Sequence, residues 1–169
     1  MCEWDRSDVM AITSESPRAG QCGIGLGSDE FGMLLGYVRL PARAELVRDA
    51  REFVRLVLRS GSAKSSVVED VELIVSELVT NVVQYCARIP SPTAVLKVSR
   101  LDASLRIEVH DPFRFVPAQR TPSADDEGGR GLTIVDALSD RWGHEATAQG
   151  KFVWCELTAW PDETADQSP

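Results

Sequence analysis

The stretch Ser76-Glu77-Leu78-Val79-Thr80-Asn81 lies within a longer run, Val67 to Cys86, that has the apolar period of an amphipathic helix. Glu77 and Asn81 are four positions apart, so both side chains project from one side of that helix, and Gln84 continues the row. This row flanks the apolar stripe instead of opposing it. We therefore expect a carboxylate and an amide at the edge of the hydrophobic core, where a cleft can open.

Apolar patterns on either side of this helix predict the rest of the fold. Short apolar runs that end at turn residues indicate strands, and a three-and-four spacing indicates a helix. In chain order the other predicted elements are a strand over Met33–Leu40, a helix over Arg43–Arg59, paired strands over Ala94–Ser99 and Leu105–His110, a helix over Leu132–Leu138, and a closing hairpin of Arg141–Glu145 and Lys151–Leu157. Together they predict an α/β (α+β) two-layer sandwich, in which a mixed, mainly antiparallel sheet carries helices on one face.

The length of 169 residues and the hydrophobic content of 43% suit one globular domain with a sizeable core. Residues 1–30 mix Ser, Gly, Pro and acidic residues without a helical or strand period, so we expect a disordered tail there. The folded domain is expected over residues 31–160, with a frayed acidic tail over residues 161–169.

The charge and the cysteines argue against several classes of function. A formal net charge of -8 and a pI near 4.8 are unsuited to a surface that binds nucleic acid. The four cysteines form no C-x-x-C pair and the two histidines have no partner at metal-ligand spacing, so free thiols in a reducing compartment fit best. The first residues do not resemble a signal peptide and no apolar run is long enough for a membrane span, so the expected location is cytoplasmic.

Two further motifs follow the helix that carries Glu77. Asp111 ends a predicted strand before Pro112, where a carboxylate can face a cavity and accept a hydrogen bond from an exocyclic amine such as that of adenine. The stretch Gly129-Arg130-Gly131-Leu132 then opens a helix whose free amides and dipole favour phosphates, and Arg130 adds a cation.

Each motif also has an ordinary structural explanation. The Glu77–Asn81 pair is compatible with a solvated helix surface, Asp111 with a turn before proline, and the glycines with a linker. Their combination, in this order, favours a site for ATP with Mg²⁺, because an Asn81 oxygen suits that hard cation. Glu77 would then lie near the terminal phosphate, where a carboxylate can orient or deprotonate an attacking hydroxyl or water.

In sequence order, these motifs resemble those of the GHKL superfamily, the ATP-binding fold shared by gyrase, the heat-shock chaperone, histidine kinases and mismatch-repair ATPases. They look most like the short anti-sigma factor serine/threonine kinases, of the standalone type common in actinomycetes. Ser76–Asn81 resembles the N-box of that family, Asp111 the aspartate of its first glycine box, and Gly129–Leu132 its second glycine box. The resemblance covers about Met33 to Trp160 and implies a Bergerat-type ATP-binding fold.

The resemblance also implies roles and partners. Glu77 would be the catalytic base, Asn81 the Mg²⁺ ligand and Asp111 the adenine contact. The residues around the phosphates would be Gly129, Arg130, Gly131 and Leu132. The expected partner is a sigma factor or an anti-sigma antagonist protein, with transfer of phosphate to a Ser or Thr of the antagonist, and a homodimer is compatible with this role.

The chain departs from the family pattern after Asp111. The first glycine box usually reads Asp-x-Gly, whereas this chain has Asp111-Pro112-Phe113, and Phe152 stands where the last strand often carries a hydroxyl residue. A second hypothesis therefore stays open, in which the protein is a non-catalytic module that binds a regulator and has a degenerate nucleotide site.

Overall fold

The computed structural model describes residues 22–23, 27–29, 32–61, 63–113 and 130–161. Its elements in chain order are β1 (Cys22–Gly23), β2 (Gly27–Asp29), β3 (Gly32–Pro41), α1 (Leu46–Ser60), α2 (Ser65–Cys86), β4 (Thr93–Leu101), β5 (Ser104–Asp111), α3 (Arg130–Leu138), β6 (Arg141–Thr147) and β7 (Gly150–Thr158). Every helix and strand predicted from residue 33 onward is present, with bounds shifted by a few residues.

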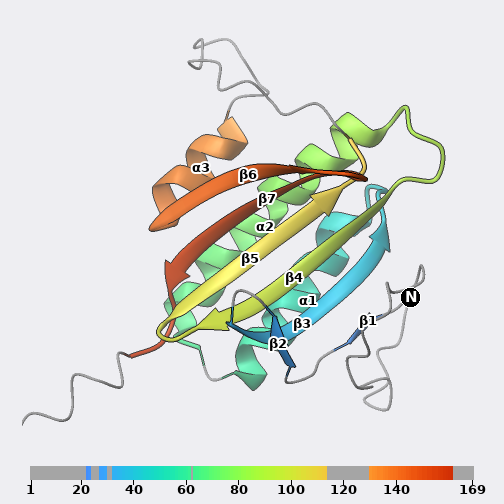
Figure 1. Ribbon diagram of the computed structural model, residues 1–169. Helices are drawn as coiled ribbons and strands as arrows, with labels where there is room; N and C mark the ends of the chain where they lie inside the picture. Colours follow the sequence, from blue (N-terminus) through green and yellow to red (C-terminus); the bar gives the residue numbers. More distant parts are fainter. Residues whose placement is uncertain (1–21, 24–26, 30–31, 62, 114–129, 162–169) are drawn as a thin grey trace, which may run out of the picture.

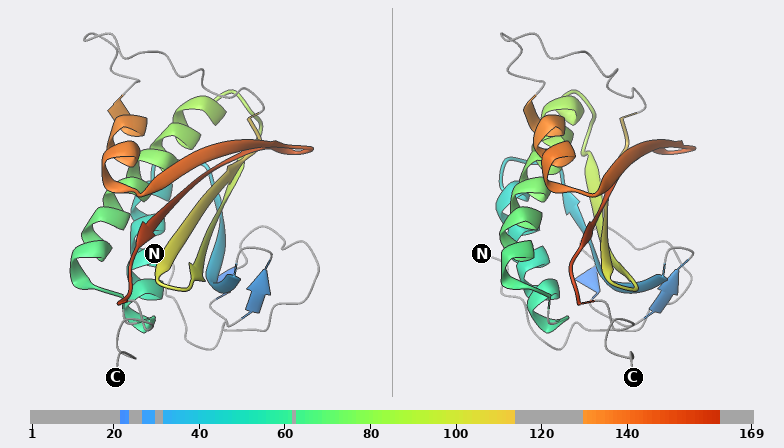
Figure 2. Two further views of the ribbon diagram at one scale, coloured as in Figure 1. Left: turned by 60° about the vertical axis from the view of Figure 1, so that its left-hand side comes forward. Right: turned by 90° about the vertical axis from the view of Figure 1, so that its left-hand side faces the viewer.

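The strands form one sheet with the order β1-β3-β4-β5-β7-β6, and β2 also pairs with β3. Every described pairing is antiparallel. All three described helices lie on one face of this sheet (Figures 1 and 2), which confirms the predicted two-layer α+β sandwich. None of these helices is long and apolar enough to cross a membrane.

Two short strands lie in the stretch for which the sequence predicted no fold. Cys22–Gly23 pairs with Val38 and Tyr37, and Gly27–Asp29 pairs with the start of β3. The prediction of a tail without structure is therefore wrong at β1 and β2, because backbone pairing with an existing strand edge needs no apolar period. The rest of residues 1–30 lies outside the described residues.

The hydrophobic core lies between the helices and the sheet. Side chains alternate along a strand, so Leu105, Ile107 and Val109 of β5 all face this core. The next residue in the same alternation is Asp111, which the strand therefore carries into the layer between sheet and helices. The position of this carboxylate follows from the period of β5.

Helix α2 spans the sheet and buries a continuous stripe of side chains. Its buried residues are Val67, Val71, Ile74, Val75, Leu78, Val79, Val82 and Cys86. Glu77 and Asn81 are half-buried beside this stripe, as their spacing predicts. Tyr85, one turn beyond Asn81, is 39% exposed.

The sheet face without helices carries a buried charge network. Arg106 donates to Glu108 at 2.8 Å and to Glu156 at 2.6 Å. The ring of His110 lies 2.8 Å from the second oxygen of Glu108. Burial by itself would raise the pKa of Glu108, but hydrogen bonds with His110 and Arg106 outweigh that effect and lower the pKa to about 2. This network occupies the face opposite the hydrophobic core.

Candidate functional site

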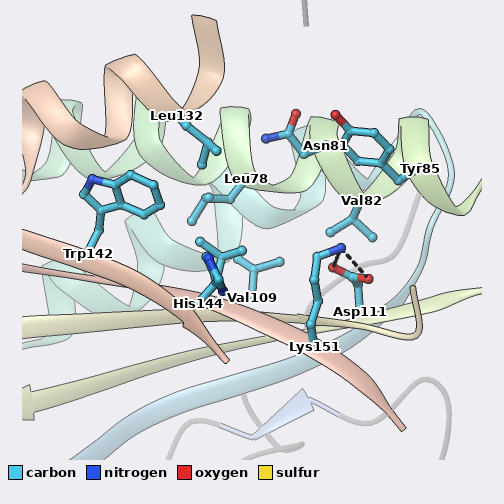
Figure 3. A pocket seen from close by; sticks show the side chains of 11 residues that line it. Leu78, Asn81, Val82, Tyr85, Val109, Asp111, Leu132, Trp142, His144 and Lys151 are labelled. Atoms are coloured by element: carbon cyan, nitrogen blue, oxygen red, sulfur yellow. Dashed lines mark hydrogen bonds and ion pairs between the residues drawn. The ribbon is translucent and has the colours of Figure 1, made fainter. Parts of the chain in front are cut away.

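A pocket opens between α2, α3 and the strands β5, β6 and β7 (Figure 3). It encloses about 510 Å³ of space, part of which is open to solvent. The side chains that line it are Leu78, Asn81, Val82, Tyr85, Val109, Asp111, Leu132, Trp142, His144, Lys151 and Val153. The lining combines apolar walls with a few polar groups, as the linings of small-molecule sites commonly do.

The start of α3 approaches the polar row of α2. A Cβ atom placed on Gly131 would lie 3.0 Å from Glu77 Oε2 and 3.4 Å from Asn81 Nδ2. Glycine at this position therefore allows the first turn of α3 to come within contact distance of the carboxylate and the amide. Leu132 of the same turn and Asn81 both line the pocket, so this close approach lies beside it.

Asp111 lies deeper in the pocket and is held by two contacts. Its Oδ1 accepts a hydrogen bond from the Phe113 backbone amide at 2.7 Å. The Lys151 ammonium lies 3.3 Å from Oδ2 of the same carboxylate. Burial raises the pKa of Asp111, and the Lys151 charge and the Phe113 amide oppose this effect only in part.

Phe113 stands where the sequence resemblance predicts a glycine, and its side chain is not among those that line the pocket. Its ring stacks on Tyr85, with centroids 5.9 Å apart and planes 15° apart. Its backbone amide holds the Asp111 carboxylate, a bond that does not depend on the side chain. Phe152, expected at the hydroxyl position of the last strand, instead stacks on His110 with centroids 4.7 Å apart. The pocket-facing residues of β7 are its neighbours Lys151 and Val153.

Trp142 of β6 fixes α3 against the sheet. Its indole nitrogen donates to the Asp136 carboxylate at 2.8 Å, and its ring lines the pocket next to Leu132 (Figure 3). This hydrogen bond joins α3 to β6 of the closing hairpin beside the pocket.

The structure therefore brings together most of the residues that the sequence singled out. Asn81, Asp111 and Leu132 line one pocket, and Glu77 borders it through its approach to Gly131. Gly129 lies outside the described residues, and for Arg130 only the backbone, at the start of α3, is described.

Sequence reasoning missed several residues that line the pocket. Lys151, Tyr85, His144 and Trp142 all contribute side chains to its lining. Side chains alternate along β7, so the sequence could have indicated that Lys151 shares a face with Val153. That Lys151 pairs with Asp111 depends on the order of the strands in the sheet.

The residues present fit a nucleotide with Mg²⁺. The pocket has an amide side chain, apolar walls and a carboxylate, and the first turn of α3 lies beside it. These features suit phosphates, a flat heterocycle and an exocyclic amine. Among the described residues, no group of three or more His, Cys, Asp or Glu could hold a metal ion. A cation here would depend on Asn81 and on phosphate oxygens, as Mg²⁺ commonly does.

A family model for the histidine kinase-like ATPase domain matches residues 40–156. The match runs from the end of β3 to near the end of β7 and includes Glu77, Asn81 and Asp111. The chain belongs to the histidine kinase-like ATPase family, which confirms the resemblance to the GHKL superfamily.

Two solved structures resemble this fold, both at low sequence identity. The RsbU and RsbW domains of a Mycobacterium tuberculosis protein share 20% identity at a TM-score of 0.57, and the match covers 73% of this chain and 32% of that one. This chain thus spans about a third of that structure, and the likeness shows the fold alone. The histidine kinase domain of the blue-light activated histidine kinase EL346 from Erythrobacter litoralis shares 19% identity at a TM-score of 0.48, over 85% of this chain and 71% of that one. No curated protein matches the chain.

Proposed function

We propose that this protein is an ATP-dependent serine/threonine kinase of the anti-sigma factor type, which transfers phosphate to a Ser or Thr of an antagonist protein. The observation that carries the proposal is the approach of Gly131 to Glu77 and Asn81 beside a pocket that Asn81 and Asp111 both line. Membership of the histidine kinase-like ATPase family supports the nucleotide. The partner class, a sigma factor or its antagonist, rests on the sequence resemblance.

Each residue has a distinct role in this proposal. Asn81 ligates Mg²⁺ through its side-chain oxygen, and the first turn of α3 at Gly131 binds phosphates through backbone amides. Asp111 accepts a hydrogen bond from the adenine amine. Bound ATP and Mg²⁺ supply the transferable phosphoryl group and neutralise its charge.

Glu77 is the catalytic base of the proposed reaction. Its carboxylate takes the proton from the attacking hydroxyl of the antagonist, whose oxygen forms a bond to the terminal phosphorus while the bond to the leaving ADP breaks. The products are a phosphoester on the antagonist, ADP, and a protonated carboxyl that returns its proton to solvent. The half-buried position of Glu77 beside Gly131 leaves it accessible to such a hydroxyl.

Calorimetric titration with ATP and Mg²⁺ tests the nucleotide site without a known partner. We expect magnesium-dependent binding that falls by about tenfold or more in Asn81→Ala, because a ligand to a charged group is lost. Gln84→Ala is the matched control, since Gln84 lies on the same helix row but is exposed, and it should bind like the wild type. An Asn81→Ala variant with unchanged affinity would show that the magnesium ligand is misassigned.

Glu77→Gln separates catalysis from binding. This variant keeps the shape of the side chain, so we expect ATP to bind while phosphate transfer to the cognate antagonist is lost. Transfer that continues at the wild-type rate would exclude Glu77 as the base.

A non-catalytic module that binds a regulator is the second candidate. It is favoured by Phe113 at the glycine position and by the ion pair that already occupies Asp111. This candidate predicts no binding at millimolar ATP, and a sharp gain of nucleotide affinity in Phe113→Gly. If the wild-type protein binds ATP and Phe113→Gly binds it with the same affinity, that result would count against the non-catalytic module.

A further inference from the structure

Lys151 is the buried cation of the pocket, and strand register brings it there. It lies directly opposite Asp111 in the β5–β7 ladder, and its side chain is 3% exposed. Its ammonium contacts both oxygens of Asp111, at 3.3 and 3.4 Å, and donates to the carbonyl of Phe113 at 3.3 Å. These distances are longer than is usual for charge-assisted hydrogen bonds, and the same side chain lines the pocket.

Two aromatic rings lie close to this ammonium. Lys151 Nζ is 5.1 Å from the centroid of Phe113 and 5.9 Å from that of Tyr85. Ring faces attract a cation at these distances without consuming its hydrogen-bond donors. Because an ammonium has three N–H donors and no acceptor, it can satisfy a ligand only at an atom that accepts a hydrogen bond.

The surroundings of Lys151 favour a heterocycle over a phosphate. Val82 and Val109 form apolar walls in the same pocket (Figure 3), and Val153 also lines it. A phosphate placed at Lys151 would also face the Asp111 carboxylate 3.3 Å from the ammonium, and two like charges would repel each other there. Phosphates are better placed beside the first turn of α3, because the start of a helix favours anions.

We propose that Lys151 is a second base-contacting residue, which donates a hydrogen bond to the ring nitrogen N1 of adenine while Asp111 accepts one from the neighbouring exocyclic amine. The cross-strand pair offers an acceptor and a donor side by side, which is the complement of these two adjacent atoms on the base edge. This inference rests on the proposed function, because it requires that adenine enters the pocket.

A comparison of ATP analogues tests Lys151 in the wild-type protein. 1-Deaza-ATP lacks the ring nitrogen N1 but keeps the exocyclic amine, so it would offer Lys151 no acceptor on the edge of the base. We expect calorimetry to show that 1-deaza-ATP binds about tenfold or more weakly than ATP. 7-Deaza-ATP is the matched ligand control, because it replaces a nitrogen away from this edge, and it should bind like ATP.

The Lys151→Met variant completes the test, because it keeps an apolar stem but has no donor. In this variant ATP and 1-deaza-ATP should bind with equal affinity. Equal affinity of the two nucleotides for the wild-type protein would overturn the role of Lys151 and leave the proposed function intact. Failure of the wild type to bind ATP at all would overturn both. If Lys151→Met does not fold, the wild-type ratio of the analogues still decides the question.

Discussion

Asp111 and Lys151 lie opposite each other across the β5–β7 ladder, and the ammonium of Lys151 is 3.3 Å from the carboxylate of Asp111 in a site where both side chains are buried. The pair lies on the sheet face that the helices cover, so its charges are removed from bulk water. Removing charges from water is costly, and a buried pair offsets that cost only while both partners are present. The stability of the domain and the chemistry of its pocket are therefore linked at this point.

The first prediction concerns the energy of this pair. Lys151→Met should lower the free energy of unfolding by about 3 kcal/mol, the low end of the range for a broken buried pair, because its contacts are long. The double variant Asp111→Asn, Lys151→Met should recover most of that loss, since it leaves no unpaired charge. Urea denaturation of both single variants and the double variant measures the coupling. Additive effects would show that the two residues do not stabilise each other.

The second prediction concerns the close approach of Gly131 to Glu77. Gly131→Ala should weaken ATP binding by about tenfold, because the new methyl would lie 3.0 Å from Glu77 Oε2 and push the first turn of α3 and the polar row of α2 slightly apart. Stability should stay level or rise by up to about 1 kcal/mol, since alanine favours helix more than glycine does. Ala137→Ser, at an exposed site on the same helix, is the control for changes to α3. Titration measures ATP affinity and thermal unfolding measures stability. A parallel loss of affinity and stability in Gly131→Ala would indicate simple misfolding.

The third prediction concerns Gly150 at the start of β7. A Cβ atom there would overlap the carbonyl oxygen of Asp111 and lie 2.7 Å from the Cα of Pro112. Because both are backbone atoms, the strand itself must move, so Gly150→Ala should lower stability by about 3 kcal/mol. Gln149→Ala, at the exposed neighbouring position, should change little. The measurement is the urea midpoint of unfolding of Gly150→Ala and of the wild type. Equal midpoints would mean that β5 and β7 can separate here without a loss of stability.

The fourth prediction concerns Glu108 and pH. Its pKa in the folded protein is about 2, below the ordinary value of 4.5, so the folded state binds this proton more weakly than the unfolded state. The resulting stabilisation is present above pH 4.5 and is lost as the pH falls from about 4.5 toward 2. Glu108→Gln should therefore be less stable than the wild type at pH 7, and the difference should shrink at pH 3.

Denaturation curves of the wild type and Glu108→Gln between pH 7 and pH 3 test this sign. Glu145→Gln, a substitution of an exposed carboxylate on β6, serves as the control. A difference between the wild type and Glu108→Gln that stays constant over this range would contradict the assignment.

The sequence determined the elements and the positions of the motifs along them. The periods of α2 and β5 are local properties, so they correctly predicted a helix row with Glu77 and Asn81 and a strand that ends at Asp111. The short strands β1 and β2 escaped prediction because they form by pairing with the edge of β3 and not through a pattern of their own.

The tertiary structure decided which residues meet in the pocket. Lys151 is 40 positions from Asp111, and only the order and register of the sheet place it opposite that carboxylate. A shift of one residue in that register would turn Lys151 to the other face and bring Phe152 into the pocket. Side-chain alternation thus tells which residues share a face, whereas pairing between distant strands, stabilised by the whole core, selects their neighbours.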